Sequence, residues 1–151
     1  MTHACVGGAA PDFTLPSHHG EPVTLSALRG RPVVLVFFPA AFTRVCTGEM
    51  GALRDGAAAF EGAGAQVLAV STDPMFALRV FAEQEALPFP LLSDFWPHGQ
   101  VAQAYDAFDH ELGTAQWASY VLDADGVITW TVVNAIGEAR DMADHLQALS
   151  R

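Results

Sequence analysis

One cysteine of this chain lies where a thiol is suited to nucleophilic chemistry. Cys46 follows the most hydrophobic run of the sequence, with Thr43 three residues and Pro39 seven residues before it. This placement predicts a cysteine in the first turn of a helix that follows a buried strand. There the free backbone N–H groups and the positive end of the helix dipole favour a thiolate. Such sites lower a cysteine pKa from about 8.5 into the range of roughly 3.5–7.5, so we expect Cys46 to be reactive.

Two neighbours of Cys46 limit the chemistry that it can perform. Thr43 stands where a Cys-x-x-Cys motif would carry its first cysteine. A hydroxyl cannot resolve a mixed disulfide, so dithiol exchange within this motif is excluded, but it can donate a hydrogen bond to the sulfur or to a substrate oxygen. Pro39 ends the strand and, having no N–H, is expected to form a dry wall beside the thiol.

The elements that must position Cys46 follow a mixed α/β order. The predicted strands are a short hairpin over 11–15 and 21–25, a strand buried on both faces over 31–38, a second buried strand over 65–72, a short strand within 89–99, and a hairpin over 117–133. The predicted helices cover 44–60, the residues after an N-cap at Asp73, a short piece over 99–105, and an amphipathic segment over 138–149. A parallel βαβ centre that ends in an antiparallel hairpin and a helix is typical of the thioredoxin-like class.

Size and charge restrict the classes of protein to consider. The 151 residues fit one domain, which we take as 1–151. A net charge of −10 with seven scattered Lys and Arg argues against nucleic acid and anionic membranes as partners. The longest apolar run is too short for a spanning helix of about 20 residues, and residues 1–13 lack a signal-peptide pattern. We therefore expect a cytoplasmic protein with free thiols, and the six histidines predict no metal site.

The spacing Pro-x-x-x-Thr-x-x-Cys, formed by Pro39, Thr43 and Cys46, resembles the active-site motif of the peroxiredoxins, and Glu49 follows three residues later as is usual in that family. The resemblance covers nearly the whole chain, through the segments "APDFTL", "VVLVFFPAAFTRVCTGEM", "VLDADGVI" and "GEARD". The segment "LLSDFWPHG" resembles the one-cysteine, AhpE-like subfamily of actinobacteria.

This resemblance implies a thioredoxin-like fold, with helices flanking a central mixed sheet, and an antioxidant thiol peroxidase without metal, haem or flavin. Cys46 would attack a hydroperoxide and become a sulfenic acid. Thr43 would orient the peroxide, and Pro39 would shield the sulfenic acid from further oxidation. An external thiol, either a small thiol or a redoxin, would regenerate the enzyme. The resemblance also implies a homodimer that uses loops near the active site.

The chain departs from the family at one functional position. Peroxiredoxins carry an arginine at the start of the strand before the "VLD" turn, and the matching residue here is Trp117. No Arg or Lys lies between Gln84 and Gly137. Glu49, which that arginine would pair, would raise the pKa of the thiol unless another cation balances it. The candidates are Arg44, which we favour, and Arg140.

Trp117 admits two interpretations. It is either filler in a slower peroxidase or, with Phe42 and Trp96, an aromatic wall that binds an apolar substrate. The second interpretation supports an alternative function, a repurposed homologue that acts on or binds a non-peroxide organic molecule. A third hypothesis, a non-catalytic binding or redox-sensing protein, conflicts with the intact Pro39, Thr43 and Cys46. Cys5 is expected to be a free thiol rather than a resolving cysteine, whose usual position is Gly51 here.

Overall fold

The chain folds around a five-stranded sheet in a computed structural model that describes residues 4–134 and 140–150. The strands lie in the order β5 (Leu91–Ser93), β4 (Gln66–Ser71), β3 (Val33–Phe37), β8 (Trp117–Leu122) and β9 (Ile128–Asn134). β3 and β4 are parallel, as are β4 and β5, whereas β8 is antiparallel to both β3 and β9. The mixed sheet and the closing hairpin are as predicted.

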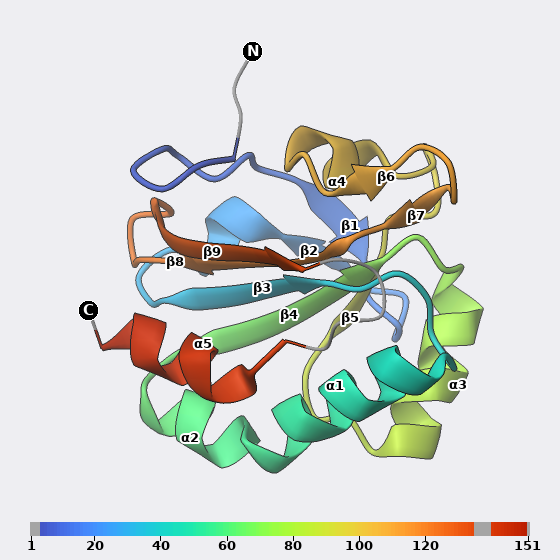
Figure 1. Cartoon of the computed structure of the whole chain (residues 1–151), viewed down its shortest axis with the longest axis horizontal. Helices are drawn as coiled ribbons and strands as arrows, with labels where there is room; N and C mark the ends of the chain where they lie inside the picture. The colour runs from blue at the N-terminus through green and yellow to red at the C-terminus, as the bar shows by residue number, and fades with distance from the viewer. Residues whose placement is uncertain (1–3, 135–139, 151) are drawn as a thin grey trace.

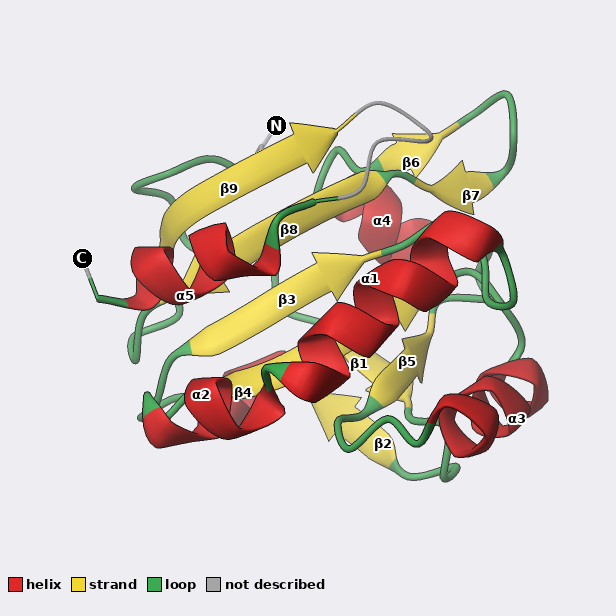
Figure 2. Cartoon of the chain, turned by 60° about the horizontal axis from the view of Figure 1, so that its bottom comes forward, coloured by secondary structure: helices red, strands yellow, loops and turns green. Residues whose placement is uncertain are grey.

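Two layers cover the sheet (Figures 1 and 2). The helices on one face are α1 (Arg44–Asp55), α2 (Ala57–Gly62), α3 (Met75–Glu85) and α5 (Met142–Leu149). The other face carries the hairpin β1 (Thr14–Pro16) and β2 (Pro22–Thr24), the 3-10 helix η1 (Leu25–Leu28), α4 (Gln100–Ala104), and the small ribbon β6 (Phe108–Asp109) and β7 (Thr114–Ala115). The core therefore has two halves, one on each side of the sheet.

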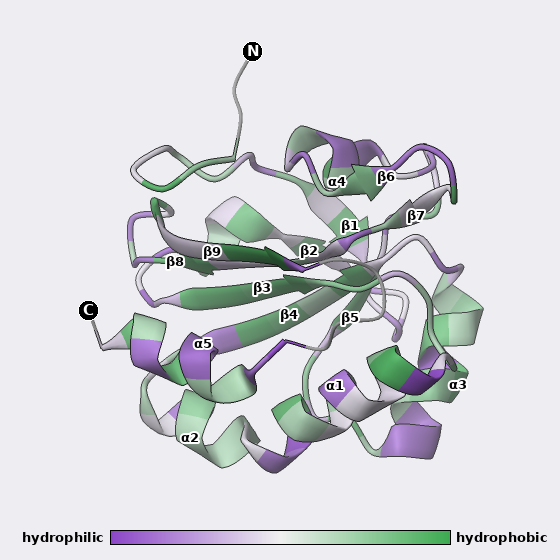
Figure 3. Cartoon of the chain, in the orientation of Figure 1, coloured by the Kyte–Doolittle hydropathy of each residue, from purple (hydrophilic) through white to green (hydrophobic). Residues whose placement is uncertain are grey.

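β3 divides its side chains between these halves. All five of its residues are buried, as expected for a central strand covered on both faces. Val34 and Val36 join the cluster that contains Cys46, whereas Leu35 and Phe37 join the cluster on the opposite face. Figure 3 shows β3 as one of the most hydrophobic segments of the chain. The strand that leads to Cys46 is thus held firmly from both sides.

Some element boundaries differ from the sequence prediction. The helix expected over 44–60 is two helices, because Gly56 ends α1 and precedes α2. Asp73 does not cap α3, because the Asp73 carboxylate accepts a hydrogen bond from the Ala41 N–H instead. The N-cap of α3 is Pro74. The closing helix begins at Met142 after Asp141, whose Oδ1 accepts the Ala143 N–H at 2.9 Å. The predicted start of that helix at 138 lies outside the described residues.

The ribbon of β6 and β7 was not predicted, because two-residue strands carry no alternation for a pattern to detect.

Among the residues that the structure describes, no helix has the length and apolar character needed to cross a membrane.

Candidate active site

The loop between β3 and α1 carries the Pro39 and Thr43 of the motif. Its Ala41 N–H donates to Asp73 Oδ2 at 2.8 Å, and the same oxygen accepts the Ser71 hydroxyl at 2.7 Å. Asp73, assigned from sequence as a helix cap, therefore ties this loop to the end of β4. Phe42 adopts a left-handed backbone conformation with φ of 69°, and its ring packs edge-on against Phe81 at 5.3 Å. These contacts fix the path of the chain into α1.

Cys46 lies in the first turn of α1, as predicted, and is completely buried. Thr43 immediately precedes the helix and is exposed; its hydroxyl donates to the Ala40 carbonyl at 2.8 Å. Pro39 is partly buried at the end of the strand. The structure thus places Thr43 and Cys46 in one turn, with the threonine exposed and the thiol buried, and Pro39 in the loop before them.

The expected lowering of the thiol pKa is not found. Burial raises the pKa of the Cys46 thiol above its ordinary value, and the negative charge of Glu49 acts in the same direction. Hydrogen bonds with the Ala40 backbone and the Thr43 side chain, and the positive charge of Arg140, act in the opposite direction. A sequence position at a helix N-terminus does not reveal that the sulfur is removed from water, and here desolvation outweighs the hydrogen bonds with Ala40 and Thr43.

This raised pKa predicts a pH-dependent reactivity. At neutral pH most of the thiol is protonated, so the thiolate fraction should rise about tenfold per pH unit between pH 6 and 8. We expect the rate of Cys46 alkylation by iodoacetamide, measured on Cys5→Ser protein so that one thiol reacts, to follow this slope. A rate that is already constant above pH 6 would show that the thiol pKa is lowered instead.

Glu49 is held by Arg140, which comes from the segment before α5. Arg140 Nη2 donates to Glu49 Oε1 at 2.7 Å, Nε donates to Oε2 at 2.8 Å, and the backbone N–H of Arg140 donates to Oε2 at 2.8 Å. Both side chains have no exposed surface. A two-point guanidinium–carboxylate contact of this kind is among the strongest pairings in proteins. Glu49 is therefore fully paired beside the thiol.

The cation that pairs with Glu49 is thus Arg140, not the Arg44 that the sequence analysis favoured. Arg44 is exposed at the start of α1. A first-turn side chain on the outer side of a helix remains in solvent, whereas Arg140 approaches from the sheet side. The sequence left both candidates open because nothing in it shows which segment packs over Glu49.

Two residues of β8, Ala118 and Ser119, also hold Arg140. Arg140 Nη1 donates to the Ala118 carbonyl at 2.8 Å and to Ser119 Oγ at 2.9 Å. Ser119 Oγ also lies 2.8 Å from His145 Nε2, and His145 Nδ1 lies 2.9 Å from the Asp141 carbonyl oxygen. Ser119 and His145 are completely buried. Neither Ser119 nor His145 was predicted from the sequence to belong to the site.

Trp117 begins β8, where its strand was predicted to begin, and belongs to the same buried cluster as Cys46. It is only 5% exposed. Its Nε1–H is buried and has no hydrogen-bond partner among the described residues. Glu49 is also buried, and Phe42 is 54% exposed on the outside of the loop. Of the four residues expected to line a substrate pocket, Trp117 and Glu49 therefore lie in the core, whereas Phe42 and Arg44 lie at the surface.

Trp96 lies on the other face of the sheet from this cluster. It is 80% exposed and lines a cavity with Phe13 and Gln100. Asp94 accepts the N–H groups of Val101 and Ala102, at 3.1 and 2.8 Å, at the start of α4. These residues support α4 and do not extend the aromatic wall of Trp117.

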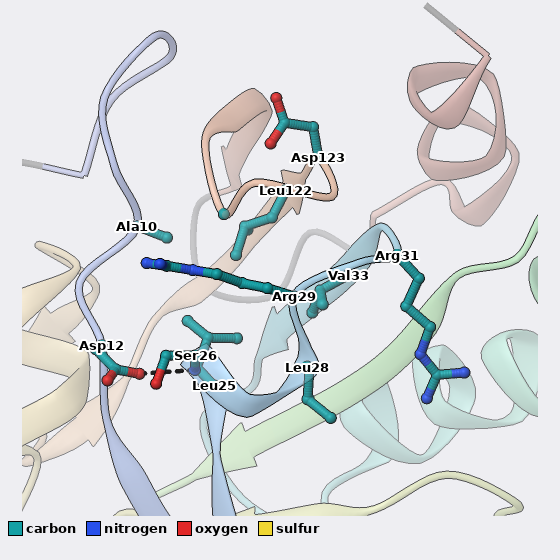
Figure 4. A pocket seen from close by; sticks show the side chains of 11 residues that line it. Ala10, Asp12, Leu25, Ser26, Leu28, Arg29, Arg31, Val33, Leu122 and Asp123 are labelled. Carbon is teal, nitrogen blue, oxygen red and sulfur yellow. Dashed lines mark hydrogen bonds between the residues drawn. The ribbon is translucent and has the colours of Figure 1, made fainter.

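A well-formed cavity also lies at the opposite end of β3 from Cys46. Its lining includes Arg29, Val33 and Leu122, and Figure 4 shows the Arg29 side chain reaching across it toward Ala10. The volume open to water inside it is about 20 Å³. That volume admits one or two water molecules, because one water needs about 10–15 Å³. The cavity therefore offers no site for an organic substrate.

Both cysteines are free thiols. Cys5 is exposed near the N-terminus, whereas Cys46 is buried. Within residues 4–134 and 140–150, no three His, Cys, Asp or Glu side chains are grouped so as to hold a metal ion.

The chain is similar to known proteins over nearly its full length. Residues 6–131 match the model of the AhpC/TSA family. Alkyl hydroperoxide reductase E of Mycobacterium tuberculosis is 44% identical over 149 residues, which cover 96% of this chain and 97% of that protein. The chloroplastic peroxiredoxin Q of Oryza sativa subsp. japonica is 36% identical over 95% of this chain and 65% of its own length.

Solved structures give the same result. The crystal structure of peroxidoxin BcpB from Mycobacterium tuberculosis superposes with a TM-score of 0.88, at 33% identity, and covers 96% of both chains. The crystal structure of Enterococcus faecalis AhpC has a TM-score of 0.89 at 24% identity, covering 96% of this chain and 90% of that chain, which shows the shared fold.

Proposed function

This chain belongs to the AhpC/TSA family and is a thiol-dependent peroxidase, and we propose that Cys46 is the residue that reduces the hydroperoxide. The observation that carries this assignment is the position of Cys46 in the first turn of α1, directly after the central strand and beside Thr43. The exposed Cys5 has no such setting.

The proposed reaction has three steps. The Cys46 sulfur attacks the terminal oxygen of a hydroperoxide; an S–O bond forms, the O–O bond breaks, and the thiol proton leaves with the alcohol or water. The sulfur is oxidised by two electrons to a sulfenic acid, and the peroxide is reduced by two electrons. One external thiol then condenses with the sulfenic acid, releasing water and forming a mixed disulfide. A second external thiol attacks that disulfide and restores the Cys46 thiol.

Thr43 and Pro39 support this chemistry from the outer side of the site. We propose that a peroxide approaches the buried sulfur past the exposed Thr43 hydroxyl, whose single proton turns from the Ala40 carbonyl to donate to a peroxide oxygen. Pro39 offers no N–H that would hold water beside the sulfenic acid. Both roles are proposals that rest on the motif and on its geometry.

The reductant is proposed to be an external thiol. We expect turnover of hydrogen peroxide and of cumene hydroperoxide with dithiothreitol as the reductant, and we expect Cys5→Ser to match the wild type within about twofold because its thiol takes no part. Turnover that stops in Cys5→Ser after one equivalent of peroxide would identify Cys5 as the resolving cysteine. No turnover in either protein would reject dithiothreitol as a usable reductant.

The alternative of a repurposed homologue receives no support. The names of the relatives point to hydroperoxides and peroxiredoxin activity. Trp117, on which the alternative depended, is nearly buried in the core. The interpretation of Trp117 as filler therefore agrees better with its surroundings.

A homodimer is proposed to form through the surface beside the active-site loop. Phe76 and Val80 lie one turn apart on α3 and are 67% and 55% exposed, and Phe42 is exposed on the adjoining loop above Phe81. Exposed apolar groups that gather in this way are typical of protein interfaces. We expect Phe76→Asp to convert a dimer into a monomer in sedimentation velocity. An unchanged sedimentation coefficient would place the interface elsewhere.

A cytoplasmic location is also proposed. It is supported by the two unpaired cysteines, since a reducing compartment keeps thiols free. Cell fractionation with a specific antibody would test it, and recovery of the protein outside the cytoplasm would contradict it.

A further inference from the structure

The hydrogen bonds around Arg140 form a chain with a fixed direction. The guanidinium can only donate, so Ser119 Oγ accepts from Arg140 Nη1. The one hydroxyl proton of Ser119 is then available to His145 Nε2, which must accept it. His145 Nδ1 faces the Asp141 carbonyl oxygen, which can only accept, so Nδ1 carries the ring proton. Each group has a partner only if His145 is the neutral imidazole protonated on Nδ1.

This chain ends at the charge that balances Glu49. The carboxylate of Glu49 raises the pKa of the Cys46 thiol after burial, and Arg140 counteracts it. Arg140 contacts Glu49 through two nitrogens of its side chain and contacts Ser119 through the third. The orientation of the guanidinium is therefore shared between α1, which carries Glu49, and β8, which carries Ser119. His145 fixes the Ser119 hydroxyl from α5.

Resting on the assignment of Cys46 as the peroxidatic residue, we propose that Ser119 and His145 are positioning residues that hold Arg140 against Glu49 and so set the reactivity of Cys46. Neither side chain is proposed to touch the substrate. β8 begins with Trp117 and not with a cation, and Arg140 is the buried cation of this site among the described residues, with its support in α5 and β8.

The arrangement also links the site to pH. The charged groups that face His145 are Arg140, Glu49 and Asp144, and the ring of Trp130 packs against it at 5.0 Å. Burial lowers the pKa of His145, and the nearby positive charge of Arg140 acts in the same direction. A second proton on His145 would turn Nε2 into a donor, remove the acceptor of the Ser119 hydroxyl and place two positive charges side by side. Acid therefore disrupts the support of Arg140.

The test compares His145→Leu, which removes the acceptor, with His145→Gln, whose amide oxygen can accept from Ser119 but does not titrate. The rate constant for oxidation of Cys46 by hydrogen peroxide is measured by stopped-flow tryptophan fluorescence. At pH 7.5 we expect His145→Leu and Ser119→Ala to be about three- to tenfold slower than the wild type, and His145→Gln to be within about twofold. A wild-type rate in both His145→Leu and Ser119→Ala overturns the proposal.

A double-mutant cycle shows whether His145 acts through Arg140. If it does, His145→Leu slows the wild type but has no further effect in Arg140→Met protein. Equal slowing in both backgrounds overturns the positioning role. Circular dichroism spectra establish that each variant is folded, and Ser119→Ala takes the place of His145→Leu in the cycle if that variant is not.

The pH profile provides a readout that a merely structural role would not change. As the pH is lowered, the logarithm of the wild-type rate constant for Cys46 oxidation should fall by one per pH unit near pH 7.5 and more steeply toward pH 5. In His145→Gln the slope should stay at one over the whole range. A wild-type slope of one down to pH 4.5 overturns the link to protonation. The matched control is His18→Gln, since His18 is also a buried histidine with a pKa lowered by burial but bonds to the Leu91 N–H, away from Arg140. It should keep the steep acid limb.

The outcomes separate this inference from the assignment of Cys46. Peroxide reduction that survives Cys46→Ser rejects the peroxidatic role itself. Normal oxidation of Cys46 in all His145 and Ser119 variants rejects the positioning role alone.

Discussion

Cys46→Ser is expected to lower the rate of hydroperoxide reduction by at least about a thousandfold, to the level of the uncatalysed reaction. A serine hydroxyl is not ionised at neutral pH and forms no sulfenic acid. The substitution replaces a completely buried thiol by a buried hydroxyl, which costs about 1–3 kcal/mol if the hydroxyl lacks a partner. The fold should therefore survive, and the loss should be chemical.

The measurement is peroxide consumption with dithiothreitol in excess, followed by a colorimetric peroxide assay. Cys46→Ala is the second variant, since it buries no polar group, and Cys5→Ser is the matched cysteine control. We expect both Cys46 variants to be inactive and Cys5→Ser to be active. Equal activity in all three would assign the reaction to some other group.

Arg140→Met is expected to slow oxidation of Cys46 by about tenfold to a hundredfold. The substitution leaves the carboxylate of Glu49 buried and unpaired beside the thiol, so the thiol pKa rises further and less thiolate is present at neutral pH. The loss of a charge-assisted interaction, of about 1.5–3 kcal/mol, corresponds to this range of rates. Breaking a buried ion pair also costs about 3–5 kcal/mol of folding stability.

Two variants separate the charge effect from a loss of folding. The double variant Glu49→Gln with Arg140→Met removes both charges, so it should regain stability and recover most of the rate, because no unbalanced carboxylate remains. Arg44→Met removes an exposed arginine and should leave the rate unchanged. Second-order rate constants with hydrogen peroxide, and urea unfolding of each variant, provide the comparison. A double variant as slow as Arg140→Met would show that Arg140 acts on the peroxide and not through Glu49.

The sequence predicted the parts of the site that depend on local pattern. The run of β-branched and aromatic residues that became β3 is buried on both faces, and Cys46 falls in the first turn of the next helix. The hairpin of β8 and β9 follows from two strand patterns around a turn. Trp117 was correctly placed at the start of its strand. Each of these features is encoded by residues close together in the chain.

The predictions that were wrong concern features that depend on contacts between distant segments of the chain. Arg140 reaches Glu49 across 91 positions of sequence, and Asp73 bonds to the loop before Cys46 across 32. The raised pKa of Cys46 results from burial under several elements, which no local pattern reports. Ser119 carried a signal that was available, because a polar residue on a strand buried throughout needs a hydrogen-bond partner. His145 had the same signal, because it is a polar residue buried in the closing helix.

The peroxidatic role of Cys46 is tested most directly by the intact mass of the reduced protein after reaction with one equivalent of hydrogen peroxide and a dimedone trap. Proteolytic mapping then assigns the modified cysteine. We expect one sulfenic acid adduct, located on Cys46, formed on the timescale of the stopped-flow fluorescence change and absent from Cys46→Ser. A Cys46 that stays reduced in excess peroxide, or an adduct confined to Cys5, would contradict it.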